Sequence, residues 1–145
     1  MVYRVYLDNC CFNRPFDDQS HLKIELETRA KLRIQELILT KKLELVTSYI
    51  LEYENDDNPY EEKRYAIANF MKFAVINVDE DKEVLSAANE VKGAGIKTKD
   101  ALHVACAIVA GCNYFVTTDN RLLGHKNNRI KVISPIDFIL EVEGA

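Results

Sequence analysis

The segment Tyr3-Arg-Val-Tyr-Leu-Asp8 is rich in β-forming residues and ends in a carboxylate. Its pattern predicts a β-strand that stops at Asp8. A second apolar run, Tyr114-Phe-Val-Thr-Thr118, has the same outline and stops just before Asp119. Between these two strands, segments with helical spacing alternate with short β-rich segments. This alternation is typical of an α/β domain with a mainly parallel sheet covered on both faces.

The remaining strands are predicted to be short and apolar, at residues 43–47, 74–78 and 130–133. Segments with helical spacing of apolar residues fill most of the rest: 20–41, 48–54, 60–72, 81–92, 98–110 and from 135 onward. Residues 9–19 are predicted as a loop. Ser48 and Thr98 are the residue types that begin helices, and Gly111 is the type that ends one.

The size and composition of the chain indicate one globular domain over residues 1–145. Hydrophobic residues make up 48% of the sequence and charged residues 29%, which excludes disordered and fibrous classes. No apolar run approaches the roughly 20 residues of a membrane helix. The first residues carry no signal-peptide pattern, so we expect a cytoplasmic protein. Four cysteines match no zinc spacing and are interpreted as reduced thiols.

The net charge of −4 argues against a simple basic nucleic-acid binder, but the charge is unevenly distributed. Residues 96–133 contain six basic side chains and only two acids, Asp100 and Asp119. Two isolated acids in a basic segment require an explanation.

Acidic residues recur where the predicted sheet would bind a ligand. In open α/β sheets, ligands bind beyond the carboxyl ends of the strands, and both Asp8 and Asp119 follow predicted strands. Taken alone, Asp119 is equally well explained as a turn residue. Asp100, in a first helical turn, is better explained by the helix dipole. Asp8 is different, because a carboxylate buried without a partner is costly, so it needs a cation or several donors.

The helix after Ser48 offers two further carboxylates, Glu52 and Glu54. Glu54 follows Ile50 by four residues and therefore lies over the apolar stripe, whereas Glu52 is rotated away from it. A glutamate on the inward side is the less expected one, so Glu54 is the candidate and Glu52 the alternative.

Four carboxylates from four segments would repel one another at one sheet edge unless they are protonated or bind a cation. A ligand set of oxygen atoms without His or Cys suits Mg²⁺ or Mn²⁺. Such a site activates water for attack on a phosphodiester, and the basic segment would supply contacts to phosphate groups.

The sequence resembles the PIN-domain family. The resemblance rests on four motifs: Val5-Tyr-Leu-Asp8, Ser48-Tyr-Ile-Leu-Glu-Tyr-Glu54, Lys99-Asp-Ala-Leu-His-Val-Ala105 and Phe115-Val-Thr-Thr-Asp119. It implies a three-layer α/β/α fold and a Mg²⁺- or Mn²⁺-dependent endoribonuclease that leaves a 5′-phosphate and a 3′-hydroxyl. The catalytic and metal-binding acids carried over by motif are Asp8, Glu54, Asp100 and Asp119.

The resemblance also implies an RNA substrate and partners. Many small members are toxins of toxin–antitoxin pairs, so an antitoxin protein is expected, and homodimers are frequent. The candidate substrate contacts are Asn9, Arg14, Lys97, Thr118 and Arg121. Thr117 or Thr118 could orient Asp119 or a metal-bound water, although packing at the end of the strand explains them equally well. His103 is interpreted as a helix-packing residue, with contact to substrate as the alternative.

The first motif departs from the family pattern, which usually has a hydroxyl residue after the aspartate. Here Asp8 is followed by Asn9, Cys10 and Cys11. This departure motivates an alternative hypothesis, a PIN scaffold of low or absent activity that binds RNA or a protein partner.

Overall fold

A five-stranded parallel sheet forms the centre of the computed structural model, which describes residues 2–93 and 95–144. Its strands follow the chain in this order: β1 (Tyr3–Leu7), β2 (Leu43–Ser48), β3 (Ile76–Val78), β4 (Tyr114–Val116) and β5 (Lys131–Ile133). Their order across the sheet is β3-β2-β1-β4-β5, and all neighbouring pairs are parallel. The strand order therefore reverses direction beside β1, between β1 and β4, where a ligand site is expected.

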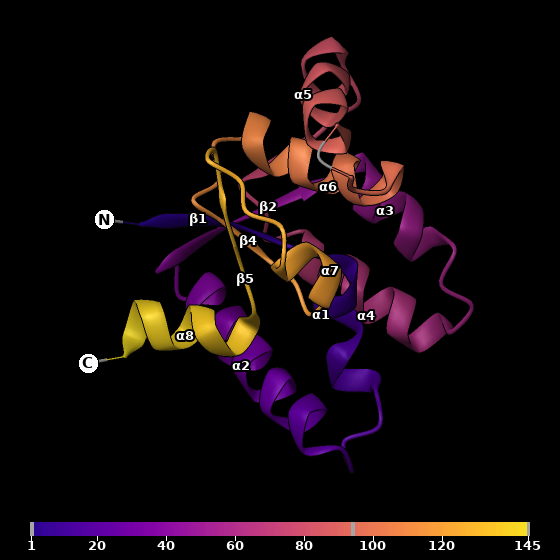
Figure 1. Ribbon diagram of the computed structural model, residues 1–145. Coiled ribbons are helices and arrows are strands. Elements are labelled where there is room, and N and C mark those ends of the chain that lie inside the picture. Colours follow the sequence, from indigo (N-terminus) through magenta and orange to yellow (C-terminus); the bar gives the residue numbers. More distant parts are fainter. Residues whose placement is uncertain (1, 94, 145) are drawn as a thin grey trace.

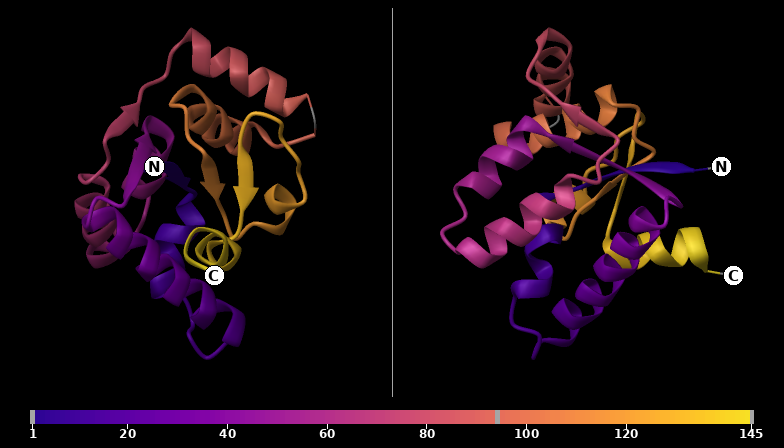
Figure 2. Two further views of the ribbon diagram at one scale, coloured as in Figure 1. Left: turned by 90° about the vertical axis from the view of Figure 1, so that its left-hand side faces the viewer. Right: turned by 180° about the vertical axis from the view of Figure 1, so that it is seen from behind.

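Helices cover both faces of the sheet (Figures 1 and 2). One face carries α2 (Leu22–Leu39) and α8 (Pro135–Glu143), while α5 (Lys82–Lys92) and α6 (Thr98–Val109) lie on the other. The helices α3 (Tyr49–Asp56) and α4 (Glu61–Met71) follow β2, and α3 packs against α6. Short helices stand at the carboxyl ends of the strands: α1 (Asn9–Asn13), η1 (Arg14–Phe16) and α7 (Asn120–Leu123). The predicted three-layer α/β/α fold is confirmed.

The core is formed by the two central strands and the helices that pack on them. Tyr6 of β1 and Phe115 of β4 are fully buried and stack with ring centroids 5.3 Å apart. Every residue of β4 is buried, as the apolar run predicted for a strand covered on both faces. This packing fixes the carboxyl ends of β1 and β4 side by side, because Val116 pairs with Leu7.

Several boundaries differ from those predicted. Residues 9–13 form α1 rather than a loop, because the Asp8 side chain caps the helix and Cys11 and Phe12 enter the core. The N-cap of α6 is Lys97, not Thr98, and it makes no side-chain capping bond. Ser48 does cap α3 by accepting from the Leu51 amide.

Three of the four cysteines are buried and all four are free thiols, as expected.

Candidate active site at the carboxyl edge of the sheet

Asp8 directly follows β1 and is buried, with only 7% of it exposed, and hydrogen bonds hold both of its carboxylate oxygens. Its Oδ1 accepts from the Asn9 amide at 2.8 Å, and its Oδ2 accepts from the Thr117 hydroxyl at 2.8 Å. The Cys10 thiol lies 3.5 Å from the same Oδ2. Burial is the largest cause that raises the pKa of Asp8, to about 7. A carboxylate in this position gains from a cation, because burial disfavours its charged form.

Thr117 connects Asp8 to the segment that carries Asp119. While its hydroxyl donates to Asp8, it accepts from the Asp119 amide at 3.0 Å. Asp119 caps α7, with Oδ1 accepting from the Arg121 amide at 2.9 Å, so its turn-forming role is real. Its side chain is only half-buried at the same edge. A cap role and a site role are compatible here, because capping engages only one of the two carboxylate oxygens.

Asp100, in the first turn of α6, lies within electrostatic reach of two other candidate acids. Its pKa is raised, first by burial and then by the charge of Asp119, with a further contribution from Glu54. The charges that act on Asp100 therefore include those of Glu54 in α3 and of Asp119 after β4, which are 46 and 19 residues away in the sequence.

Glu54 is part of a buried hydrogen-bonded chain that sequence reasoning missed. Its Oε1 contacts Nε2 of His103, and Nδ1 of His103 lies 2.6 Å from the Tyr6 hydroxyl. The Tyr6 hydroxyl in turn lies 2.6 Å from the Ser48 hydroxyl, which accepts from the Leu51 amide. Tyr6, Ser48 and His103 are at most 1% exposed.

The donor and acceptor of each hydrogen bond in the series Glu54–His103–Tyr6–Ser48 follow from its two end groups, a carboxylate and a hydroxyl that already accepts from the Leu51 amide. A carboxylate only accepts, so Nε2 of His103 donates to Glu54. In the neutral ring Nδ1 then accepts from Tyr6, and the Tyr6 oxygen accepts from Ser48. Every member is satisfied, and one oxygen of Glu54 is fixed. His103 packs in the helix interface as predicted, but it also orients Glu54. A histidine on the apolar stripe of α6 was the available signal, because a buried imidazole requires a partner.

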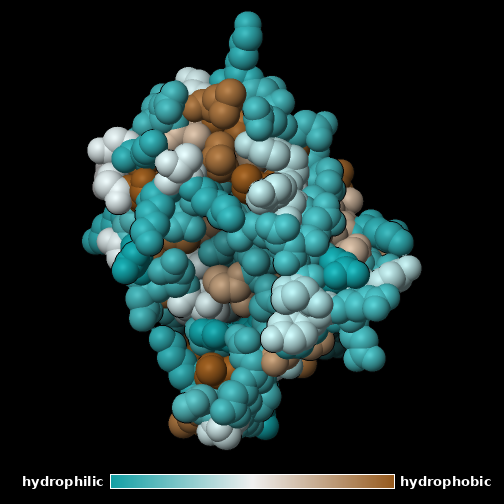
Figure 3. All heavy atoms as spheres, turned by 90° about the vertical axis from the view of Figure 1, so that its right-hand side faces the viewer, coloured by the Kyte–Doolittle hydropathy of each residue, from teal (hydrophilic) through white to brown (hydrophobic). Residues whose placement is uncertain are grey.

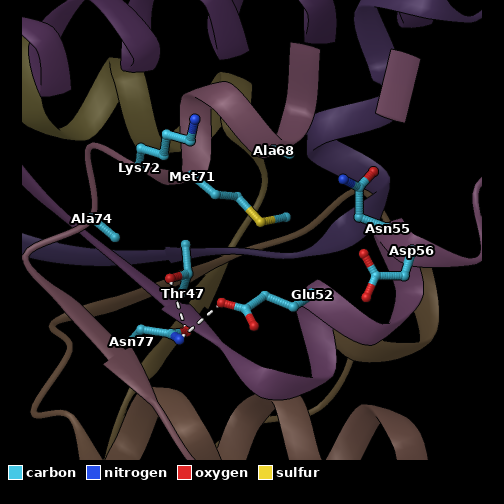
Figure 4. A pocket seen from close by; sticks show the side chains of 9 residues that line it. All are labelled: Thr47, Glu52, Asn55, Asp56, Ala68, Met71, Lys72, Ala74 and Asn77. Atoms are coloured by element: carbon cyan, nitrogen blue, oxygen red, sulfur yellow. Dashed lines mark hydrogen bonds between the residues drawn. The ribbon is translucent and has the colours of Figure 1, made fainter. Parts of the chain in front are cut away.

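Glu52, the alternative acid, points toward Asn77 of β3, whereas Glu54 points toward His103 of α6. It accepts from Nδ2 of Asn77 at 2.9 Å, and Oδ1 of Asn77 accepts from the Thr47 hydroxyl at 3.2 Å. These three residues line a pocket of about 470 Å³ between α3, α4 and β3 (Figure 4). Glu52 and Glu54 therefore face separate surroundings, as the helical rotation predicted.

Arg14, predicted as a phosphate contact, is engaged within the chain. Its guanidinium contacts Glu27, which is 1% exposed, at 3.0 Å and Asp17 at 3.0 Å. Its carbonyl oxygen accepts from the Thr28 hydroxyl. Because the guanidinium of Arg14 already pairs with two carboxylates, we do not expect it to bind a phosphate of the substrate.

The other predicted substrate contacts surround the acids. Lys97 and Arg121 are exposed, at the starts of α6 and α7. Thr118 is buried and its amide donates to the Cys10 sulfur at 3.4 Å. Asn9 is half-buried and accepts from the Asn13 side chain. Lys97 and Arg121 are therefore the best placed of these four to meet a phosphate.

The donor set fits a hard divalent cation in its chemistry, since all four candidate acids offer oxygen. Over residues 2–93 and 95–144, no group of three His, Cys, Asp or Glu side chains is already gathered around one point for a metal ion.

The face that carries α3, α4 and α7 is mostly hydrophilic (Figure 3). Among the helices of the described segments, none combines the length and apolar character needed to span a bilayer.

The protein has a three-layer α/β/α fold, and the candidate acids Asp8 and Asp119 follow β1 and β4, the two strands between which the strand order reverses. The sequence model of the family described as "PIN domain" matches residues 5–127. The chain therefore belongs to the PIN domain family, whose members are generally nucleases.

One solved structure similar to this chain is described as "Crystal structure of VapBC2 from Rickettsia felis bound to a DNA fragment from their promoter". It shares 14% sequence identity with this chain at a TM-score of 0.57, over 90% of this chain and 98% of the other. At that identity the similarity concerns the fold. A comparison with curated protein sequences finds no match.

Proposed function

We propose that this protein is a metal-dependent endoribonuclease that hydrolyses RNA phosphodiesters with Asp8, Glu54, Asp100 and Asp119. The observation that supports this most is the buried carboxylate of Asp8, which accepts from the Thr117 hydroxyl while the same hydroxyl accepts from the Asp119 amide. A buried carboxylate costs stability unless hydrogen bonds or a cation offset the loss of its hydration. Membership of a family of nucleases agrees with this reading.

The four acids would hold Mg²⁺ or Mn²⁺, which when bound polarises a phosphoryl oxygen and lowers the pKa of a coordinated water. The chain's own groups prepare this site. Thr117 fixes one oxygen of Asp8, and His103 fixes one oxygen of Glu54. Lys97 and Arg121 would bind the phosphates on either side of the scissile bond.

We further propose that the protein is the toxin of a toxin–antitoxin pair, inhibited by an antitoxin protein. The support is the family together with the fold shared with a chain of the VapBC2 complex. Co-expression with the product of an adjacent gene, followed by co-purification, tests this partner. The homodimer stays a prediction, which sedimentation of the purified protein tests.

The alternative is a PIN scaffold that binds RNA or protein without turnover. Asn9 favours it, because it stands directly after Asp8, where the family pattern usually has a hydroxyl residue.

The deciding experiment measures cleavage of a mixed single-stranded RNA pool with Mn²⁺ and with EDTA. We expect cleavage by the unaltered protein in Mn²⁺ only, and its loss in Asp100→Asn and Glu54→Gln. Glu52→Gln is the matched control, because Glu52 lies on the same helix but faces Asn77. Turnover that survives Asp100→Asn would refute the assignment, while Mn²⁺ binding without any turnover would favour the scaffold.

A further inference from the structure

The exposed ring of Tyr53 and the ammonium group of Lys99 meet where α3 packs on α6, the two helices that carry Glu54 and Asp100. Tyr53 directly precedes Glu54 in α3, and Lys99 directly precedes Asp100 in α6. Since α3 and α6 pack side by side (Figure 1), the residues before the two acids also come together. Nζ of Lys99 lies 5.9 Å from the centre of the Tyr53 ring.

The surroundings of this pair indicate a binding role. Tyr53 is 59% exposed although its neighbours Ile50 and Leu51 on the same helix are buried. An exposed cation–π contact adds little to the stability of a fold. The exposed surface of Tyr53 is therefore open to a flat ligand, with the Lys99 ammonium 5.9 Å from the ring centre. Flat bases stack on exposed aromatic side chains.

We propose that Tyr53 and Lys99 form a subsite for one unpaired nucleotide of an RNA chain, with the base stacked on Tyr53 and a phosphate bound by Lys99. This inference rests on the proposed function, because it places that nucleotide next to the acids of the cleavage site. Aromatic side chains bind unpaired bases of any identity through their faces, whereas the bases of a duplex are covered by their neighbours. The subsite therefore selects single-stranded RNA without selecting its sequence.

The charges around the pair agree with a nucleotide. Lys97 lies two residues before Lys99, at the start of the same helix, and is exposed. Two cations at this rim offset the repulsion between an RNA backbone and the acids beside them. Of Tyr53, Lys97 and Lys99, Tyr53 alone makes a contact that requires an exposed base. Replacing Tyr53 therefore distinguishes base stacking from the electrostatic attraction of the two lysines for phosphate.

The test uses a single-stranded RNA oligonucleotide that contains 2-aminopurine, whose fluorescence reports stacking. Binding is measured in EDTA, where metal-dependent cleavage does not occur. We expect Tyr53→Ala to weaken binding about tenfold and to remove the fluorescence change, the effect of losing one base–aromatic stack. Tyr53→Phe keeps the aromatic face and should bind like the unaltered protein. The matched control is Tyr65→Ala, since Tyr65 on α4 is 65% exposed.

Lys99→Met separates the second contact. It should weaken binding and make its dependence on salt concentration less steep by about one phosphate contact. A duplex of the same sequence should bind the unaltered protein and Tyr53→Ala equally weakly.

The outcomes distinguish this inference from the proposed function. Tyr53-dependent binding without cleavage would support the subsite and count against the nuclease. Cleavage that needs Asp100 but whose KM is the same in Tyr53→Ala would support the nuclease and overturn the subsite. Binding that Tyr53→Phe weakens as much as Tyr53→Ala, or a lack of any binding by the unaltered protein, would also overturn it.

Discussion

Replacing His103 tests whether the buried chain from Ser48 to Glu54 controls the metal site. His103→Leu removes the donor to Glu54 and the acceptor for the Tyr6 hydroxyl in one step. His103→Gln keeps an amide that can still donate toward Glu54. Tyr6→Phe removes the hydroxyl that links Ser48 to His103 and leaves the contact between His103 and Glu54 intact.

The structure sets the size of the expected effects. A hydrogen bond to a charged group contributes about 1.5–3 kcal/mol, and a buried hydroxyl left without a partner costs about 1–3 kcal/mol. We therefore expect His103→Leu to lower the free energy of unfolding by about 3 kcal/mol. Tyr6→Phe should lower it by about 1 kcal/mol, because it leaves Glu54 paired. Partners that orient metal ligands typically contribute about 10- to 100-fold in metal affinity.

Two assays separate stability from orientation. Urea unfolding in EDTA gives the free energy of unfolding, and calorimetric titration of the folded protein gives its affinity for Mn²⁺. We expect His103→Leu to bind Mn²⁺ at least about tenfold more weakly, with most of the affinity restored in His103→Gln and unchanged in Tyr6→Phe. A folded His103→Leu protein that binds Mn²⁺ as tightly as the unaltered protein would refute the reasoning.

Three further predictions concern stability. Lys31 is 5% exposed, and burial lowers its pKa to about 8. Between pH 8 and the ordinary lysine pKa of 10.5 the unfolded chain therefore binds more protons than the folded protein, so the free energy of unfolding rises with pH across that window. Lys31→Met should be more stable than the unaltered protein at pH 7 by up to about 3 kcal/mol, and urea unfolding should show this difference shrinking up to pH 10.5. Glu27→Ala leaves Arg14 without its buried partner and should cost about 3 kcal/mol in urea unfolding; RNA cleavage per folded molecule should stay the same, and a selective loss of turnover would return Arg14 to the substrate surface. Gly111 has φ of +72°, so Gly111→Ala should cost about 1 kcal/mol in thermal unfolding, and an unchanged melting temperature would contradict that backbone strain.

The sequence predicted the fold class and the approximate positions of the strands, because these depend on neighbouring residues. A run such as Tyr114–Val116 is apolar throughout, which is the pattern of a strand buried on both faces. The cap at Ser48 was also readable, since the hydroxyl bonds an amide three residues away. The same local logic separated Glu54 from Glu52 by helical rotation alone.

Local patterns failed where burial decided the outcome. Residues 9–13 have the composition of a loop, yet they form α1 because Cys11 and Phe12 enter the core and Asp8 caps the helix. Thr98 is a residue type that caps helices, yet it is the first residue of α6, and the N-cap is Lys97, whose side chain makes no capping bond.

The sequence by itself determined which acids this protein carries, in which order, and at the ends of which elements. Only the tertiary structure decided what each one contacts. Glu54 meets His103 across 49 residues, and His103 meets Tyr6 across 97. Arg14, which looked free to bind phosphate, instead pairs with Glu27. Such contacts depend on how helices pack on the sheet, since the energy of a buried polar group is set by the partner that folding brings to it and not by its neighbours in the chain.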